Sequence, residues 1–309
     1  MQGGPPPGPP PGQQQYGAPP GPPPGQQQYG APPGPPPGQQ QYGAPPGPPP
    51  GQQQHGGGAS GPHDVAGYQR DLEKAIQEKQ LQAFYPPGSP QIQQIAQRAP
   101  QQVDQLCQAW RIPKEIANDI VRLALYDVVL YIDDSGSMSF EENGERIKDL
   151  QLILSRVAFA ATLFDDDGIS LEFMNDASIP KNMLSGIKTE GQIQQLMANK
   201  RYKGLTPFGT KLREKVIDGI VVPEIRGGQM RKPVLIISIT DGQPAGEPAN
   251  ALMDTIRYAL QVAQGSRYGK NAVAFQFAQV GNDQKATEFL AKLDEDHAVG
   301  DMVDCTSSE

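Results

Sequence analysis

Asp127-Val-Val-Leu-Tyr-Ile-Asp-Asp-Ser-Gly-Ser137 is the stretch that decides the fold of this chain. Residues 128–132 are apolar or aromatic at every position, which is typical of a strand buried on both faces. Such strands belong to parallel sheets that helices cover on both sides. The carboxylates and hydroxyls that follow therefore belong to a loop at the carboxyl end of a strand, where α/β sheets bind their ligands.

Toward the C-terminus the same pattern repeats, as strands that alternate with helices. Apolar runs predict further strands at 169–174, 234–239, 272–280 and 302–305. Amphipathic stretches predict helices at 146–164, 210–220, 249–263 and 285–293. The fold class that we predict for 127–309 is therefore α/β, a doubly wound and mostly parallel sheet flanked by helices.

Residues 64–126 predict a small helical collar in front of this domain. The first helix is expected at 68–82, and the Pro86-Pro87-Gly88 turn separates it from the second, at 92–99. A third is expected at 103–110, and Pro113 opens a fourth. Their apolar stripes predict packing against the next domain, and a binding module of its own is the alternative.

The first 63 residues have a different character. The 13-residue unit that starts at Gln13 recurs from Gln26 and from Gln39, and no Asp, Glu, Lys or Arg precedes Asp64. Such a composition cannot bury enough apolar surface to offset the entropy of ordering, so we predict a disordered tail over 1–63. Its Pro runs favour polyproline II, which a proline-recognition domain of a partner could bind; a solubilising spacer is the other interpretation.

Charge and composition exclude several classes of protein. The formal net charge is −8, and the basic residues form no stripe of the kind that nucleic-acid binders carry. Lys211, Arg213 and Lys215 have the spacing of a solvated helix face. The longest apolar runs are too short for a membrane span, and the N-terminus resembles no secretory signal. Two cysteines, Cys107 and Cys305, predict reduced and partly buried thiols, so we expect a cytoplasmic protein.

Three polar loops are expected at one edge of the sheet: 133–137, 204–210 and 240–242. They contain carboxylates and hydroxyls but no His or Cys, and hard oxygen ligands favour Mg²⁺, with Mn²⁺ or Ca²⁺ as alternatives. The alternate spacing of Asp133, Ser135 and Ser137 lets a tight loop direct all three side chains to one point. Asp134, between them, is expected to be solvated, and Thr210 is expected to cap the helix that follows.

These residues carry a resemblance to a known family. Asp133-x-Ser135-x-Ser137, a loop threonine at Thr206 and a Thr-Asp-Gly turn with Asp241 resemble the metal-ion-dependent adhesion site (MIDAS) of von Willebrand factor A (vWA) domains. The resemblance covers 127–309, and all five positions match. The arrangement with a Pro/Gln-rich head also resembles intracellular fungal proteins of this family, and more distantly the A domains of copines.

The resemblance implies a role for each residue. The hydroxyls of Ser135, Ser137 and Thr206 would contact the metal, and Asp133 and Asp241 would hold metal-bound water. An Asp or Glu carboxylate of a protein partner would then complete the coordination. We therefore expect an intracellular adaptor that binds its partner through a divalent cation, and no enzyme.

Two alternatives remain beside this interpretation. The first is a structural vWA scaffold whose metal site is vestigial. The second is a phosphatase of the haloacid dehalogenase type with Asp133 as nucleophile, although Ser135 stands where such an enzyme needs its general acid. A serine hydrolase is disfavoured, because Ser137 lacks a nucleophile-elbow pattern and the only histidines are His55, His63 and His297.

Overall fold

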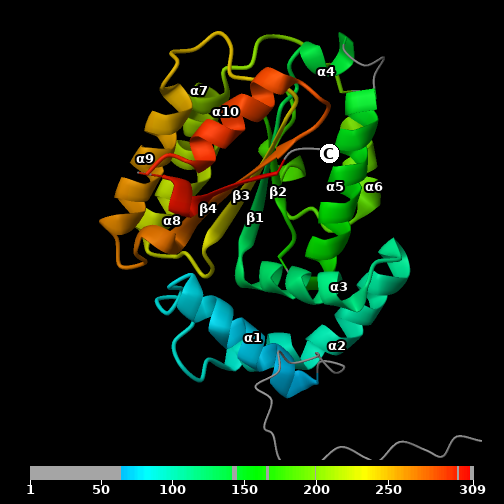
Figure 1. Ribbon diagram of the computed structural model, residues 1–309, viewed down its shortest axis with the longest axis vertical. Helices are drawn as coiled ribbons and strands as arrows, with labels where there is room; N and C mark the ends of the chain where they lie inside the picture. Colours follow the sequence, from blue (N-terminus) through cyan, green and yellow to red (C-terminus); the bar gives the residue numbers. More distant parts are fainter. Residues whose placement is uncertain (1–63, 141–144, 165–166, 199, 298, 307–309) are drawn as a thin grey trace, which may run out of the picture. The chain divides into compact units, whose positions relative to one another are not determined.

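The computed structural model describes residues 64–140, 145–164, 167–198, 200–297 and 299–306, so the predicted disordered tail lies outside the described residues. Five strands form one sheet in the order β2-β1-β3-β4-β5, and every neighbouring pair is parallel (Figure 1). They are β1 (Asp127–Ile132), β2 (Ser170–Phe173), β3 (Val234–Thr240), β4 (Val273–Gln279) and β5 (Val303–Thr306). The predicted fold class is confirmed, and one antiparallel bridge, between Ile169 and Ile187, lies beside the sheet.

The register of the strands decides where the polar loops meet. Ile132, the last residue of β1, pairs with Phe173 on one side and with Ile239 on the other. The three strands therefore end at the same level, and the loops that follow them begin side by side.

Helices cover both faces of the sheet, as Figure 1 shows. Side chains of a strand point alternately to its two faces. Leu130 of β1 belongs to a buried cluster with Leu150 and Leu154 of α5 (Glu145–Phe164), and α6 (Glu190–Met197) contributes to the same cluster. Tyr131 belongs to a second cluster, with Ile256 of α9 (Ala251–Gln264). This alternation is why the β1 stretch is apolar at successive positions.

The helix that follows the second polar loop, 204–210, differs from the prediction. It begins at Phe208 and continues as α7 (Phe208–Lys211), the π-helical η4 (Leu212–Val221) and α8 (Val222–Gly227). Thr210 is therefore inside the helix, and the expectation that it caps the helix is wrong. The carboxylate of Glu247 caps it instead, accepting from the backbone N–H groups of Gly209 at 2.9 Å and Thr210 at 2.7 Å.

Lys215 also departs from the expectation of a solvated helix face. Its ammonium donates to the backbone carbonyls of Phe173 and Asp176, at the carboxyl end of β2. The side chain therefore ties the π-helical segment to the sheet edge at which the polar loops gather.

The helical collar shares its core with the sheet. It consists of α1 (Val65–Glu78), α2 (Pro90–Trp110), α3 (Lys114–Ile120) and the 3₁₀ turn η1 (Val121–Leu125). The buried collar residues belong to the same cluster as Tyr131, and Phe84 stacks on Tyr268 at 5.2 Å between ring centroids. The expected packing of the apolar stripes is confirmed.

One collar prediction is wrong, because the second and third predicted helices are a single helix, α2, with Pro100 inside it. An internal proline removes one helical hydrogen bond and strains the turn before it. Ala99 and Val103, on either side of Pro100, are both fully buried, so the apolar stripe continues through the proline and offsets its cost.

The remaining elements are short or lie at the C-terminal end. They are α4 (Ser137–Phe140), η3 (Lys181–Met183), η5 (Lys270–Ala272), α10 (Gln284–Asp294) and η6 (Gly300–Met302). Cys107 and Cys305 are free and half-buried, as predicted. Within the described ranges, no helix combines the length and apolar character needed to cross a membrane.

Candidate metal centre

The loop after β1 is organised by the buried side chain of Asp133. This carboxylate accepts the backbone N–H of Ser135 at 2.9 Å through Oδ1 and the hydroxyl of Thr240 at 2.7 Å through Oδ2. The first contact closes a tight turn within the loop, and the second joins the loop to the end of β3. Asp133 therefore sets the shape of the loop and its attachment to the neighbouring strand.

Three further predicted residues form a chain of hydrogen bonds across the same edge. The hydroxyls of Ser135 and Ser137 lie 3.0 Å apart, and the Ser137 hydroxyl donates to Oδ1 of Asp241 at 3.0 Å. Asp241 follows β3 and is fully buried. The fold therefore brings together four of the five predicted residues, which come from two loops 104 positions apart.

Thr206, the fifth predicted residue, reaches this edge through its loop. The backbone N–H of Gly136 donates to the carbonyl of Gly204 at 3.1 Å, which places the two loops in contact. Thr206 is buried, and its carbonyl accepts the backbone N–H of Ala245 at 2.8 Å. The described contacts of Thr206 thus run through its backbone, whereas the other four residues are linked through their side chains.

The electrostatics of the site result from two buried carboxylates. Burial, and then the negative charge of Asp241, raise the pKa of Asp133 to about 6, although the hydrogen bonds from Ser135 and Thr240 oppose this rise. Both side chains are fully buried, so their repulsion is little screened by solvent. A bound cation would relieve this repulsion.

The chemistry of the donor set fits a hard divalent cation. Carboxylate and hydroxyl oxygens are the ligands that Mg²⁺ and Ca²⁺ take in proteins. In the part of the chain that the structure describes, no group of three or more His, Cys, Asp or Glu side chains is arranged to hold a metal ion. A metal at this edge would therefore depend on the serine hydroxyls to supplement the two carboxylates.

Arg146, at the start of α5, is a member of the site that sequence reasoning missed. Its Nη1 donates to Oδ2 of Asp241 at 2.7 Å, and only 3% of its side chain is exposed. The two oxygens of Asp241 therefore have different partners, Ser137 on one and Arg146 on the other. No sequence pattern marks this contact, because a charged residue in a first helical turn is ordinarily solvated.

Asp134 is not solvated, and that expectation is wrong. Its carboxylate is 1% exposed and accepts the backbone N–H groups of Asn175 at 2.6 Å and Asp176 at 3.1 Å. The buried ammonium of Lys200 lies 2.5 Å from Asp134 and 2.9 Å from Asp176. Asp133 contacts Thr240 at the end of β3, and Ser135 contacts Ser137. Asp134, between them, contacts the segment that follows β2.

Two large apolar side chains lie beside the site, Phe140 at the end of α4 and Leu205 on the 204–210 loop. Phe140 is 83% exposed and Leu205 is 63% exposed. The Phe140 ring lies against Gly136, where an added Cβ would be 3.4 Å from the ring. The Leu205 side chain lies against Gly246, where an added Cβ would be 2.6 Å from it. We call Phe140 and Leu205 the apolar rim.

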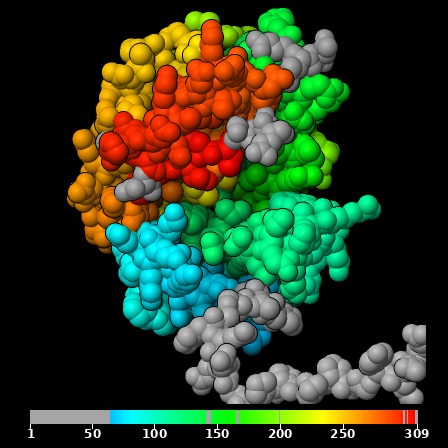
Figure 2. All heavy atoms as spheres, in the orientation of Figure 1, coloured from blue at the N-terminus to red at the C-terminus, as the bar shows by residue number. Residues whose placement is uncertain are grey.

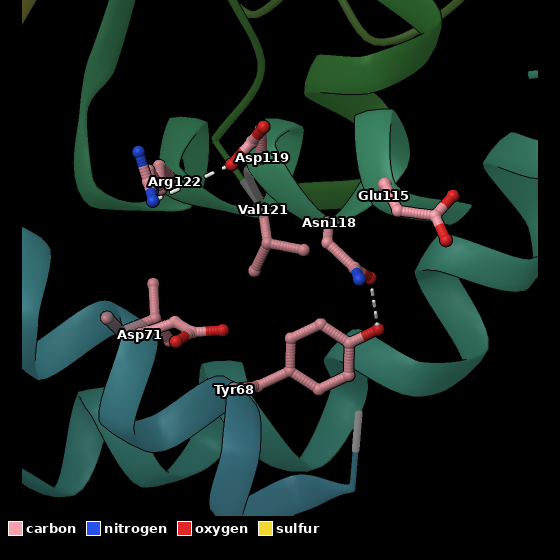
Figure 3. A pocket seen from close by; sticks show the side chains of 8 residues that line it. Tyr68, Asp71, Glu115, Asn118, Asp119, Val121 and Arg122 are labelled. Carbon is pink, nitrogen blue, oxygen red and sulfur yellow. Dashed lines mark hydrogen bonds and ion pairs between the residues drawn. The ribbon is translucent and has the colours of Figure 1, made fainter. Parts of the chain in front are cut away.

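Two hollows lie elsewhere, at the collar. Figure 3 shows a pocket of about 220 Å³ where Tyr68 of α1 donates to Asn118 of α3 at 2.7 Å, with Asp71, Glu115 and Arg122 around it. A larger groove of about 650 Å³ lies between the end of α1 and the strands β4 and β5, on the face shown in Figure 2, where the collar is cyan and the last strands are orange to red. Neither hollow contains residues predicted to bind a ligand.

No protein-family model matches this sequence, and no curated protein matches it at a significant level.

Proposed function

We propose that this chain is an intracellular adaptor that binds a protein partner through a divalent cation, in the manner of a vWA domain. The observation that carries the proposal is the pair of fully buried carboxylates, Asp133 and Asp241, joined to two serine hydroxyls at one sheet edge. Burying two unbalanced charges is costly unless a cation or hydrogen bonds offset them. Arg146 and the hydrogen bonds to Asp133 offset part of this charge, and a bound cation would offset more.

Each residue has a role in this proposal. Ser135, Ser137 and Thr206 would hold Mg²⁺, or Mn²⁺ or Ca²⁺, through their hydroxyls, and Asp133 and Asp241 would supply its counter-charge. A cation with an open coordination position attracts an Asp or Glu side chain of a partner.

The apolar rim supports a protein as that partner. An exposed apolar surface rimmed by polar groups is a common feature of protein-binding surfaces. A segment that presents a carboxylate flanked by apolar side chains would contact the cation and the rim together. The proposed location is the cytoplasm.

Metal binding tests the proposal directly. Mn²⁺ titrated into the metal-free chain should give one saturable site, followed by its electron paramagnetic resonance signal, and Ser135→Ala should weaken binding at least tenfold. Ser139→Ala is the matched control, because its hydroxyl contacts the same loop, at the Gly136 carbonyl (2.9 Å), outside the proposed ligand set. Absence of saturable binding to the wild-type chain would remove the proposal.

Of the alternatives, a specific observation favours the vestigial scaffold. The guanidinium of Arg146 already stabilises Asp241, so the site has a positive charge without a metal. Under this alternative the wild-type chain binds no Mn²⁺ at millimolar concentration and its melting temperature does not respond to EDTA.

The phosphatase alternative has less support. Both carboxylate oxygens of Asp133 are engaged in hydrogen bonds and the side chain is fully buried, which is unfavourable for a nucleophile that must reach a phosphorus atom. Hydrolysis of p-nitrophenyl phosphate that is lost in Asp133→Asn would restore this alternative.

A further inference from the structure

Three buried charged side chains meet at the candidate metal centre. Asp133 and Asp241 are fully buried carboxylates, and Arg146 is a buried guanidinium that contacts one of them. Taken alone, these three described side chains sum to −1 at neutral pH when both carboxylates are ionised. A divalent cation changes the sum to +1, and a partner's carboxylate then brings it to zero.

The same count without Arg146 has a different outcome. The two carboxylates sum to −2, a divalent cation neutralises them, and a partner's carboxylate would leave an excess of −1. In a buried site such differences matter, because charges interact more strongly there than in water. Arg146 therefore disfavours the cation alone and favours the cation together with an anion.

The geometry explains how the guanidinium can stay when a cation binds. It contacts Oδ2 of Asp241, while Ser137 contacts Oδ1, so the side of Asp241 that faces the serines is not the side that Arg146 occupies. Arg146 and a cation among the serines can therefore share this carboxylate through different oxygens.

We infer that Arg146 is a positioning residue that serves as a resident counter-ion: it holds Asp241 in place without metal, weakens the affinity for the cation, and makes a partner carboxylate strengthen cation binding. This inference rests on the proposed function and adds the coupling between its two ligands. In thermodynamic terms, cation and anion each raise the affinity for the other.

The test compares Mn²⁺ affinity in the wild-type chain and in Arg146→Met, which keeps an unbranched apolar stem but removes the charge. We expect Mn²⁺ to bind roughly tenfold more tightly to Arg146→Met, since the repulsion between two cations is lost. Arg146→Lys keeps the charge and should stay close to wild type. Arg156→Met is the matched control, because Arg156 lies on the same helix with its guanidinium 6.0 Å from the Trp110 ring, away from the site.

A second measurement separates this role from a merely structural one. Without metal, Arg146→Met should melt at a lower temperature than wild type, and saturating Mn²⁺ should raise its melting temperature by more than it raises that of wild type. Acetate, used as a carboxylate probe against chloride at equal ionic strength, should stabilise the Mn²⁺-loaded wild type more than the loaded variant.

The outcomes distinguish the two proposals. If wild type binds no Mn²⁺, the proposed function fails and the inference fails with it. If wild type binds Mn²⁺ and Arg146→Met binds it equally or more weakly, the inference alone is overturned. A variant that does not fold even in saturating Mn²⁺ also overturns it, because the cation should replace the missing charge.

Discussion

Lys200→Met should be among the most destabilising single substitutions near the polar loops that follow the strands. The side chain of Lys200 is 1% exposed, and its ammonium lies 2.5 Å from the carboxylate of the equally buried Asp134. It also lies 3.8 Å from the centroid of the Phe173 ring. Methionine keeps most of the apolar stem against that ring, so the substitution removes mainly the charge and its hydrogen bonds.

The magnitude follows from what remains after the charge is removed. Removing one partner of a buried ion pair costs about 3–5 kcal/mol, because the other charge stays buried without compensation. Asp134 still accepts two backbone N–H groups, from Asn175 and Asp176, so we expect the lower end, about 3 kcal/mol. For a folded region of this size that corresponds to a fall in melting temperature of about 6–12 °C.

Urea unfolding at neutral pH, followed by circular dichroism, measures this loss as a lower midpoint at an unchanged slope. The double variant Asp134→Asn, Lys200→Met removes both charges and should recover part of the stability. Lys74→Met is the exposed control, since Lys74 pairs with Glu78 at 3.7 Å in solvent and should change stability by less than about 1 kcal/mol. A loss below about 1 kcal/mol for Lys200→Met would refute the reasoning and favour a solvated Asp134.

Three further predictions concern the site and its support. The pKa of Asp133 is about 6 in the folded chain and about 4 in the unfolded chain, so the stability of the metal-free wild type should fall as pH rises through that interval. Asparagine does not titrate there, so in EDTA the melting temperature of Asp133→Asn should gain on that of wild type from pH 4 to 7. A difference between the two melting temperatures that does not change with pH would contradict this. Gly209→Ala should cost about 2 kcal/mol or more in urea unfolding, since its Cβ would lie 2.1 Å from the α9 backbone, whereas Gly219→Ala, with a nearest atom at 3.4 Å, should not. Replacing Phe140 and Leu205 by serine should leave Mn²⁺ affinity unchanged but reduce several-fold the EDTA-sensitive partners recovered by affinity capture and mass spectrometry; equal recovery would speak against the rim.

The fold could be predicted from local patterns because each strand carries its own signal. The β1 stretch is apolar at successive positions since both of its faces are covered, and the strand ends bring Asp133 and Asp241 to one edge. The order and spacing of the four linked site residues are therefore readable from the sequence alone. Whether they hold a metal stays a prediction.

The contacts that sequence patterns miss share a physical cause. Arg146 and Lys200 are charged residues whose burial depends on carboxylates far away in the sequence, so neither periodicity nor composition marks them. Pro100 and Thr210 are local signals that the tertiary structure overrides, through the buried stripe of α2 in one case and the carboxylate of Glu247 in the other.

The pairing of β1 with β3 also determines when the site comes into existence during folding. Asp133 and Thr240, which hydrogen-bond to each other, are 107 residues apart in the sequence. Closing so long a loop has an entropic cost, and non-local parallel pairing is intrinsically slow. A chain that has completed β1 and β2 but not β3 lacks Asp241 beside the serines, so a partner that needs the whole site would bind only molecules that have finished folding.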